Sequence, residues 1–232
     1  MLPPGEFVPV TEQTGLIVPL GRWVLEEACR WVRAWHLARP GEPAVGLSVN
    51  LSVRQVQDPN LVADIERVLA ATEFPPRLLK LEVTESVAMD DESAHVAVLR
   101  DLKGLGVKLA IDDFGTGYSA LSYLRRCPVD ALKIDRSYVA GLGRNPEDET
   151  IVRAIVAFSL AMGLQVTAEG VETAGQLDKL RALGCELGQG YHFTRPLPPE
   201  ALAGWLPPQA GPVVAIASLA EVAPEREVFP TA

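Results

Sequence analysis

The sequence has few of the residues that would place it in a disulfide-bonded, zinc-binding or nucleic-acid-binding class. Its three cysteines among 232 residues lie far apart and form no CxxC pair, so we expect reduced thiols in a cytoplasmic protein. The three histidines, His36, His95 and His192, make no ligand cluster, which argues against zinc. Acidic residues outnumber basic ones by 30 to 21, and no basic stripe favours a nucleic-acid polymer as partner.

Long apolar runs are also absent. No stretch reaches the roughly 20 residues that a membrane-spanning helix needs, and the first residues lack the basic-then-apolar pattern of a signal peptide. We therefore expect no membrane segment in this chain. With 48% hydrophobic residues, the sequence can form one domain with a sizeable core. Its net charge of −9 still permits an anionic ligand, provided that metal ions invert the local charge.

From residue 45 onward, short aliphatic segments alternate with segments of helical period. The alternation predicts an α/β fold with a parallel sheet of about six strands. The expected strands are 45–51, 79–84, 107–112, 131–135, 164–169 and 187–192. The expected helices contain the apolar stripes at 20–35, 61–69, 96–102, 151–158 and 177–183.

Within these strands, aliphatic and polar residues alternate. Leu79, Leu81 and Val83 share one face of their strand, whereas Lys80 and Glu82 lie on the other. A (β/α) barrel explains this pattern, because its lumen takes the polar face and its active site lies at the carboxyl ends of the strands. An open sheet with polar strand ends that cap helices is the alternative. Six strands leave an eight-stranded barrel two short.

The two ends of the chain fit the alternation less well. Residues 1–15 read as a loop with a short extended piece, and residues 206–232 are rich in proline and alanine. We expect a barrel domain over 1–205 and a disordered tail over 206–232.

The predicted strand ends supply oxygen ligands and one lysine. These residues are Asn50, Glu82, Asp112, Asp113, Lys133, Asp135, Glu169 and Gln189. Clustered carboxylates suit hard cations such as Mg²⁺ or Mn²⁺. The adjacent aspartates could serve two ions, with one carboxylate bridging both, although a lone Asp-Asp pair also fits a turn or a helix cap. Lys133 could orient a water or a phosphate oxygen, and the loop after Asp113 could close over substrate.

Seven short sequence motifs follow one another along the chain. They are FVPVTEQTGLI (7–17), VNLS (49–52), LEVTES (81–86), AIDDFGTGYSALSYL (110–124), LKIDRSYV (132–139), TAEGVET (167–173) and GCELGQGYHFTRPLP (184–198). In order and spacing they resemble the EAL-domain family, the cyclic di-GMP phosphodiesterases of bacteria. The resemblance covers about residues 1–200.

The resemblance implies a TIM-like barrel that uses two Mg²⁺ or Mn²⁺ ions to hydrolyse cyclic di-GMP to linear pGpG. It assigns metal binding to Asn50, Glu82, Asp112, Asp113 and Glu169, with Glu169 alternatively a general base. Lys133 should position the catalytic water, Glu172 should hold the 115–119 loop, and Gln189 should lie near substrate. For Asp135 and Tyr118 we expect substrate contacts, with a buried hydrogen bond the alternative for Asp135 and a dimer contact for Tyr118. Glu85 is expected at a helix end or behind the site.

The family is named for a Glu-Ala-Leu motif on its second strand, and no such tripeptide opens this chain. We therefore expect the chain to start after the first two strands and to lack one metal ligand. Three functions stay open: a phosphodiesterase, a non-catalytic cyclic di-GMP-binding or regulatory module, and another carboxylate-metal barrel enzyme such as an enolase-type lyase. A homodimer is a further expectation from the family.

Overall fold

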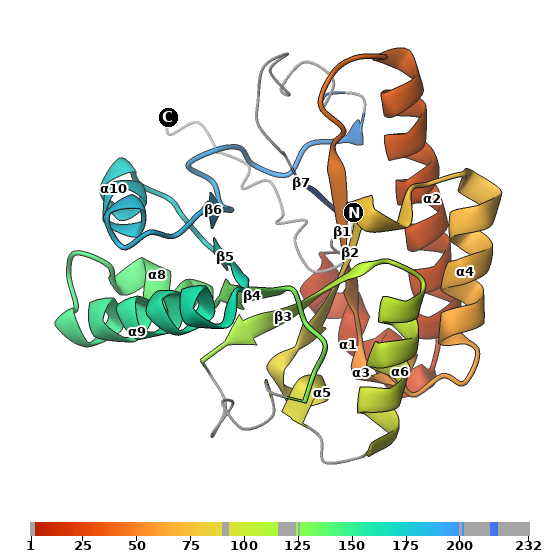
Figure 1. Cartoon of the computed structure of the whole chain (residues 1–232), viewed down its shortest axis with the longest axis horizontal. Coiled ribbons are helices and arrows are strands. Elements are labelled where there is room, and N and C mark those ends of the chain that lie inside the picture. Colours follow the sequence, from red (N-terminus) through yellow and green to blue (C-terminus); the bar gives the residue numbers. More distant parts are fainter. Residues whose placement is uncertain are drawn as a thin grey trace, which may run out of the picture.

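A seven-stranded parallel sheet forms the centre of the molecule, with strand order β6-β5-β4-β3-β2-β1-β7. The computed structural model describes residues 3–89, 93–115, 124, 126–199, 201 and 214–217. The strands are β1 (Gly46–Leu51), β2 (Leu79–Thr84), β3 (Lys108–Phe114), β4 (Ala131–Ile134), β5 (Gln165–Ala168), β6 (Leu187–Gly188) and β7 (Val214–Ala217). The sheet curls into a half-barrel (Figure 1), which confirms the predicted TIM-like α/β fold.

The six predicted strands are found as β1 to β6, and each pairs in parallel with the next along the chain. The last is shorter than the predicted 187–192, because it ends at Gly188 and a turn follows at 191–193. The seventh strand was not predicted. Val214–Ala217 lies within the segment expected to be a tail, yet it pairs with β1 in the register Gly46↔Val214 to Val49↔Ala217. This pairing supplies hydrogen-bond partners to an edge of β1 that would otherwise be open.

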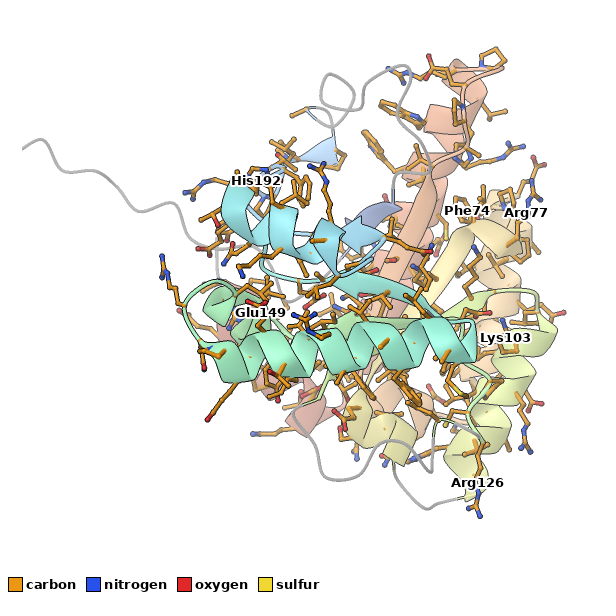
Figure 2. The ribbon with its side chains drawn as sticks, turned by 60° about the vertical axis from the view of Figure 1, so that its left-hand side comes forward. Phe74, Arg77, Lys103, Arg126, Glu149 and His192 are labelled. Carbon is orange, nitrogen blue, oxygen red and sulfur yellow. The ribbon has the colours of Figure 1, made fainter. Side chains whose placement is uncertain are left out.

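The helices cover the outer face of the curled sheet. They are α1 (Pro4–Thr14), α2 (Ile17–Ala38), α3 (Val53–Val56), α4 (Leu61–Thr72), α5 (Glu85–Met89), α6 (Ser93–Gly104), α8 (Arg136–Gly141), α9 (Pro146–Met162) and α10 (Ala174–Ala182), with a short 3₁₀ turn η1 (Pro76–Leu78). Helices α2, α4 and α6 lie on one side, and α8, α9 and α10 on the other (Figure 1). Figure 2 shows α9 lengthwise, with Glu149 near its beginning. None of the described helices combines the length and apolar character needed to cross a membrane.

Helix α10 begins at the capping box that the sequence indicates. Thr173 accepts a hydrogen bond from the backbone of Gln176, whose side chain bonds back to the Thr173 backbone. Asn145 similarly caps α9 ahead of Pro146. Helix α4 starts at Leu61, after a turn in which the Asn60 N–H donates to the Asp58 side chain at 2.9 Å.

The expectation of a loop over residues 1–15 was wrong, because Pro4–Thr14 forms α1. Pro4 occupies the first turn, where a missing N–H has no consequence. Pro9 lies inside the helix, where it removes one hydrogen bond. Contact with α2 and the left-handed Gly15, which ends α1 with φ of 79°, favour the helix over the loop.

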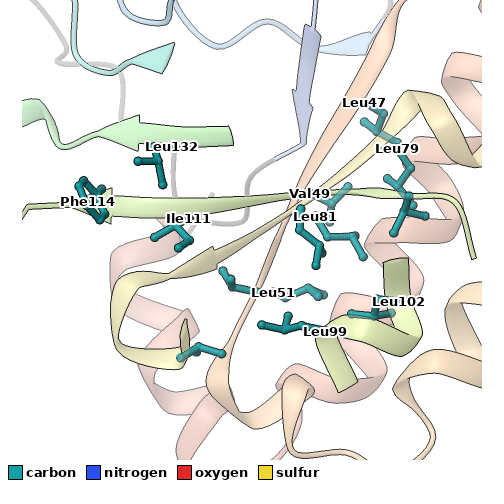
Figure 3. Close-up of a cluster of buried hydrophobic side chains, with 14 of the residues drawn as sticks. Leu47, Val49, Leu51, Leu79, Leu81, Leu99, Leu102, Ile111, Phe114 and Leu132 are labelled. Carbon is teal, nitrogen blue, oxygen red and sulfur yellow. The ribbon is translucent and has the colours of Figure 1, made fainter. Parts of the chain in front are cut away.

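The aliphatic face of the sheet makes the core. Leu47, Val49, Leu79 and Leu81 are buried, and Figure 3 shows them with Leu99 of α6 and other side chains between sheet and helices. The opposite face carries the polar residues, several of them also buried. The strand alternation thus predicts both faces, and the polar face leads to the site.

Candidate functional site

Parallel pairing brings the strand ends together on the polar face. Asn50 lies opposite Glu82 in the β1–β2 register, and Thr84 lies opposite Asp112 in the β2–β3 register. Glu169 follows β5 directly, and its backbone N–H donates to the Ile134 carbonyl at 3.1 Å. Side chains from β1, β2 and β3 and from the residue after β5 are thus brought to the same face as β4, which lies between β3 and β5.

The Lys133 side chain, only 4% exposed, is the centre of this group. Its ammonium nitrogen lies 2.5 Å from Glu82 Oε2 and 3.0 Å from Asp112 Oδ1, and it also contacts Glu169 Oε1. We call Lys133, Glu82, Asp112 and Glu169 the lysine–carboxylate cluster. Three carboxylates from three further strands thus share one cation.

Charge and burial oppose each other in this cluster. Burial alone would lower the pKa of Lys133, but the carboxylates of Glu82, Glu169 and Asp112 raise it, so the ammonium stays protonated. Burial, together with the charges of Asp112 and Glu82, raises the pKa of Glu169 to about 8, although Lys133 pulls it down. One lysine therefore does not balance the negative charge of its neighbours.

Asp113 adds a further carboxylate beside the cluster. Burial and then Asp112 raise the pKa of Asp113 to about 6. Its backbone is left-handed, with φ of 54°, which is uncommon for a residue other than glycine. One oxygen each of Asp112, Asp113 and Glu169 lies within 4.8 Å of the others, close enough to hold a metal ion.

The donor set fits a hard divalent cation. Every member of this group of three offers a carboxylate oxygen, the ligand type that Mg²⁺ and Mn²⁺ prefer. The group includes three of the five predicted metal ligands. Glu82 lies in the cluster with them, and Asn50 is the register neighbour of Glu82.

Glu85, which was expected at a helix end or behind the site, begins α5 and contacts the start of the 115–119 loop that Glu172 was predicted to hold. Glu85 is buried, and its Oε2 accepts a hydrogen bond of 2.9 Å from the N–H of Gly115, at the end of β3. Glu172, the residue predicted to hold the 115–119 loop, is exposed, and its backbone N–H donates to Gln176. Residues 116–119 lie outside the described part, so the role of Glu172 stays a prediction.

Asp135 and Gln189 directly follow β4 and β6, respectively. Asp135 caps α8 by accepting from the Ser137 N–H at 2.9 Å, and it shares a hydrogen bond with Asp113. Gln189 follows β6 and is half-buried, with its backbone N–H donating to Ala168 at 2.8 Å. Tyr118 lies outside the described residues.

Comparison with known protein families shows to which family the chain belongs. The family profile described as EAL domain matches residues 1–196. The chain belongs to the EAL domain family. Signaling protein YkoW of Bacillus subtilis is 46% identical to this EAL domain over 200 residues, which are 85% of the chain and 24% of that protein.

Two further relatives have names that state an activity. The bifunctional diguanylate cyclase/cyclic di-GMP phosphodiesterase MucR of Pseudomonas aeruginosa is 45% identical over 87% of this EAL domain and 29% of its own length. Cyclic di-GMP phosphodiesterase NbdA of the same organism is 43% identical over 89% of this chain and 26% of its own. The EAL domain described here thus spans less than a third of these relatives.

Solved EAL structures share the fold. The PaMucR phosphodiesterase in complex with c-di-GMP superposes with a TM-score of 0.82 at 46% identity, covering 86% of this chain and 80% of that one. The EAL domain of Mycobacterium smegmatis DcpA gives a TM-score of 0.74 at 41% identity, covering 80% and 82%.

Proposed function

We propose that this EAL domain hydrolyses one phosphodiester bond of cyclic di-GMP to give linear pGpG, with two Mg²⁺ or Mn²⁺ ions. The observation that carries the proposal is the convergence of Glu82, Asp112 and Glu169 on the buried Lys133, beside Asp113. Relatives named cyclic di-GMP phosphodiesterases support it, as does the related structure in complex with c-di-GMP.

In the proposed reaction, water adds to a phosphate of the cyclic dinucleotide and one P–O ester bond breaks. The water oxygen becomes part of the new phosphate monoester, and its proton passes by way of a carboxylate to the leaving ribose oxygen. Glu169 would accept that proton, and the Lys133 ammonium would hold the water or a phosphate oxygen. Asp135, Gln189 and Tyr118 would contact the substrate, and Glu172 would hold the 115–119 loop.

Asp112, Asp113 and Glu169 would hold the divalent cations, with Glu82 and Asn50 as the further ligands. When bound, such ions neutralise the charge that develops on the phosphate and make water a better nucleophile. With the cations bound, the clustered carboxylates would stay ionised at neutral pH, because the positive charge of the cations balances their negative charge.

A turnover assay tests this function. Purified protein is incubated with cyclic di-GMP and Mn²⁺, and pGpG is separated by chromatography. We expect release of pGpG that Glu169→Gln abolishes, whereas Glu186→Gln, an exposed residue of the same charge, leaves it unchanged. Absence of pGpG from wild-type protein that binds cyclic di-GMP would instead support the non-catalytic binding module. The homodimer and the cytoplasmic location predicted from the sequence are further proposals, tested by light scattering and by cell fractionation.

A further inference from the structure

Three side-chain contacts connect β4 and the residues after it to the last part of β3 and to Gly115, which follows it. Lys133 pairs with Asp112, and Asp135 shares a hydrogen bond with Asp113. The Tyr138 hydroxyl, from α8, donates to the Gly115 carbonyl at 2.5 Å. The first two contacts belong to the site described above, whereas Tyr138 has no role in the proposed reaction.

Gly115 is held on both sides of its backbone. Glu85 accepts from its N–H at 2.9 Å, while Tyr138 donates to its carbonyl. The Tyr138 ring also packs against the glycine, since a Cβ at Gly115 would lie 3.1 Å from the ring and 3.2 Å from Ile155. With φ of 104°, Gly115 has a conformation that other residues rarely adopt. Its position is therefore fixed by its neighbours rather than by local preference.

This restraint matters because Asp113 lies just two residues before Gly115. The left-handed backbone of Asp113, with φ of 54°, is less favourable than the ordinary regions and persists when surrounding contacts determine it. That conformation accompanies the approach of the Asp113 carboxylate to Asp112 and Glu169 within 4.8 Å. A contact that anchors Gly115 thus helps to hold the Asp113 carboxylate near those of Asp112 and Glu169.

We propose that Tyr138 is a positioning residue: by donating to the Gly115 carbonyl, its hydroxyl keeps Asp112 and Asp113, at the irregular end of β3, in the conformation that binds the divalent cation. Tyr138 acts through Gly115, to which its hydroxyl donates. The inference deepens the proposed function and rests on its metal site, although not on turnover.

Tyr138→Phe tests the inference, because it deletes the hydroxyl and keeps the packed ring. The matched control is Thr72→Val, which deletes a buried hydroxyl that donates to the Val68 carbonyl at 2.7 Å on α4, a helix on the other side of the sheet. Mn²⁺ affinity is measured by calorimetry, and melting temperatures are compared. We expect Tyr138→Phe to weaken Mn²⁺ binding by about tenfold. Thr72→Val should bind Mn²⁺ like wild type even if it melts lower.

Amide hydrogen exchange at Gly115 gives a readout that needs no metal. The exchange rate should rise in Tyr138→Phe and stay unchanged in Thr72→Val. Equal Mn²⁺ affinity and equal Gly115 exchange in the two variants would overturn the proposal, as would a wild-type protein that binds no Mn²⁺. If wild type binds Mn²⁺ yet releases no pGpG, the phosphodiesterase assignment fails, while the affinities still decide the role of Tyr138.

Discussion

The two faces of the central sheet are buried to nearly the same degree but differ in what burial achieves. Leu81 is 0% exposed on the outer face, and its neighbour Glu82 is 3% exposed on the inner one. Burying Leu81 removes apolar surface from water and stabilises the fold. Burying Glu82 removes a charge from water, which is favourable only because Lys133 lies 2.5 Å away.

The comparison shows that burial alone does not identify a structural residue. On the outer face each side chain contributes to stability nearly by itself, so losses should add from site to site. On the inner face the charges depend on one another, because one ammonium serves three carboxylates. Substitutions on the outer face should therefore affect mainly stability, and substitutions in the lysine–carboxylate cluster mainly activity.

The largest effect is expected on the inner face, from Asp112→Asn. The amide keeps the shape but removes a negative charge from the candidate metal group, so pGpG release should fall by about a thousandfold, or roughly 4 kcal/mol in the barrier. The melting temperature should change little or rise, because one of three carboxylates around Lys133 is neutralised. A variant that retains activity within about tenfold of wild type would contradict the assignment.

On the outer face, Leu81→Ala should show the opposite behaviour. Removal of a fully buried side chain leaves a cavity and should lower the free energy of unfolding by about 2–5 kcal/mol. Activity measured well below the melting temperature should stay close to that of wild type. Urea unfolding and the pGpG assay on the same preparation check both halves. A stability loss below about 1 kcal/mol would show that this face is packed less tightly than the structure indicates.

Lys80→Met should change the free energy of unfolding by less than Leu81→Ala, because Lys80 is an inner-face residue outside the lysine–carboxylate cluster. Its ammonium is buried and donates to the Gln165 side chain at 3.2 Å. Replacing an imperfectly compensated buried charge by an apolar chain should leave the free energy of unfolding unchanged or raise it by up to about 2 kcal/mol. Lys108→Met, at the neighbouring exposed lysine, is the control. A clear destabilisation by Lys80→Met alone would mean that Lys80 contributes to the fold as a charge.

The smallest effect on stability should come from breaking the surface ion pair between Glu149 and Lys179, in which Lys179 Nζ lies 2.6 Å from Glu149 Oε2. Lys179 lowers the pKa of Glu149, first through the hydrogen bond and then through its charge. A carboxyl group whose pKa is lower in the folded than in the unfolded state stabilises the fold at pH values above the unfolded-state pKa. That stabilisation is lost as the pH falls through the folded-state pKa. Lys179→Ala should therefore melt slightly below wild type at pH 7, with the difference vanishing in acid. A difference that persists at pH 2 would point to lost packing instead.

Much of the fold was predictable because strand alternation encodes which side chains face the helices and which face inward. The same alternation placed Glu82, Asp112, Lys133 and Glu169 at strand ends, where the structure brings them together. Helix α1 was not predictable from local preference, since its prolines argue against a helix and contact with α2 favours one. Strand β7 depends on the edge of β1, which lies far away in the sequence.

The finer geometry of the site could not be predicted for the same reason. The left-handed backbone of Asp113 and the contacts of Glu85 and Tyr138 with Gly115 depend on segments 23 to 30 residues apart. Sequence patterns report the period of each strand or helix, but they carry little information on which residue of a loop reaches across to another strand. Glu85 was expected at a helix end or behind the site, and it does begin α5, but its partner Gly115 could not be read from the sequence.

Anomalous scattering from a crystal of the protein soaked in Mn²⁺ would show where the divalent cation binds. We expect an anomalous peak in contact with carboxylate oxygens of Asp112, Asp113 and Glu169, with Lys133 beside it. A map with no peak among these residues at saturating Mn²⁺, or with a peak held by other side chains, would contradict this expectation.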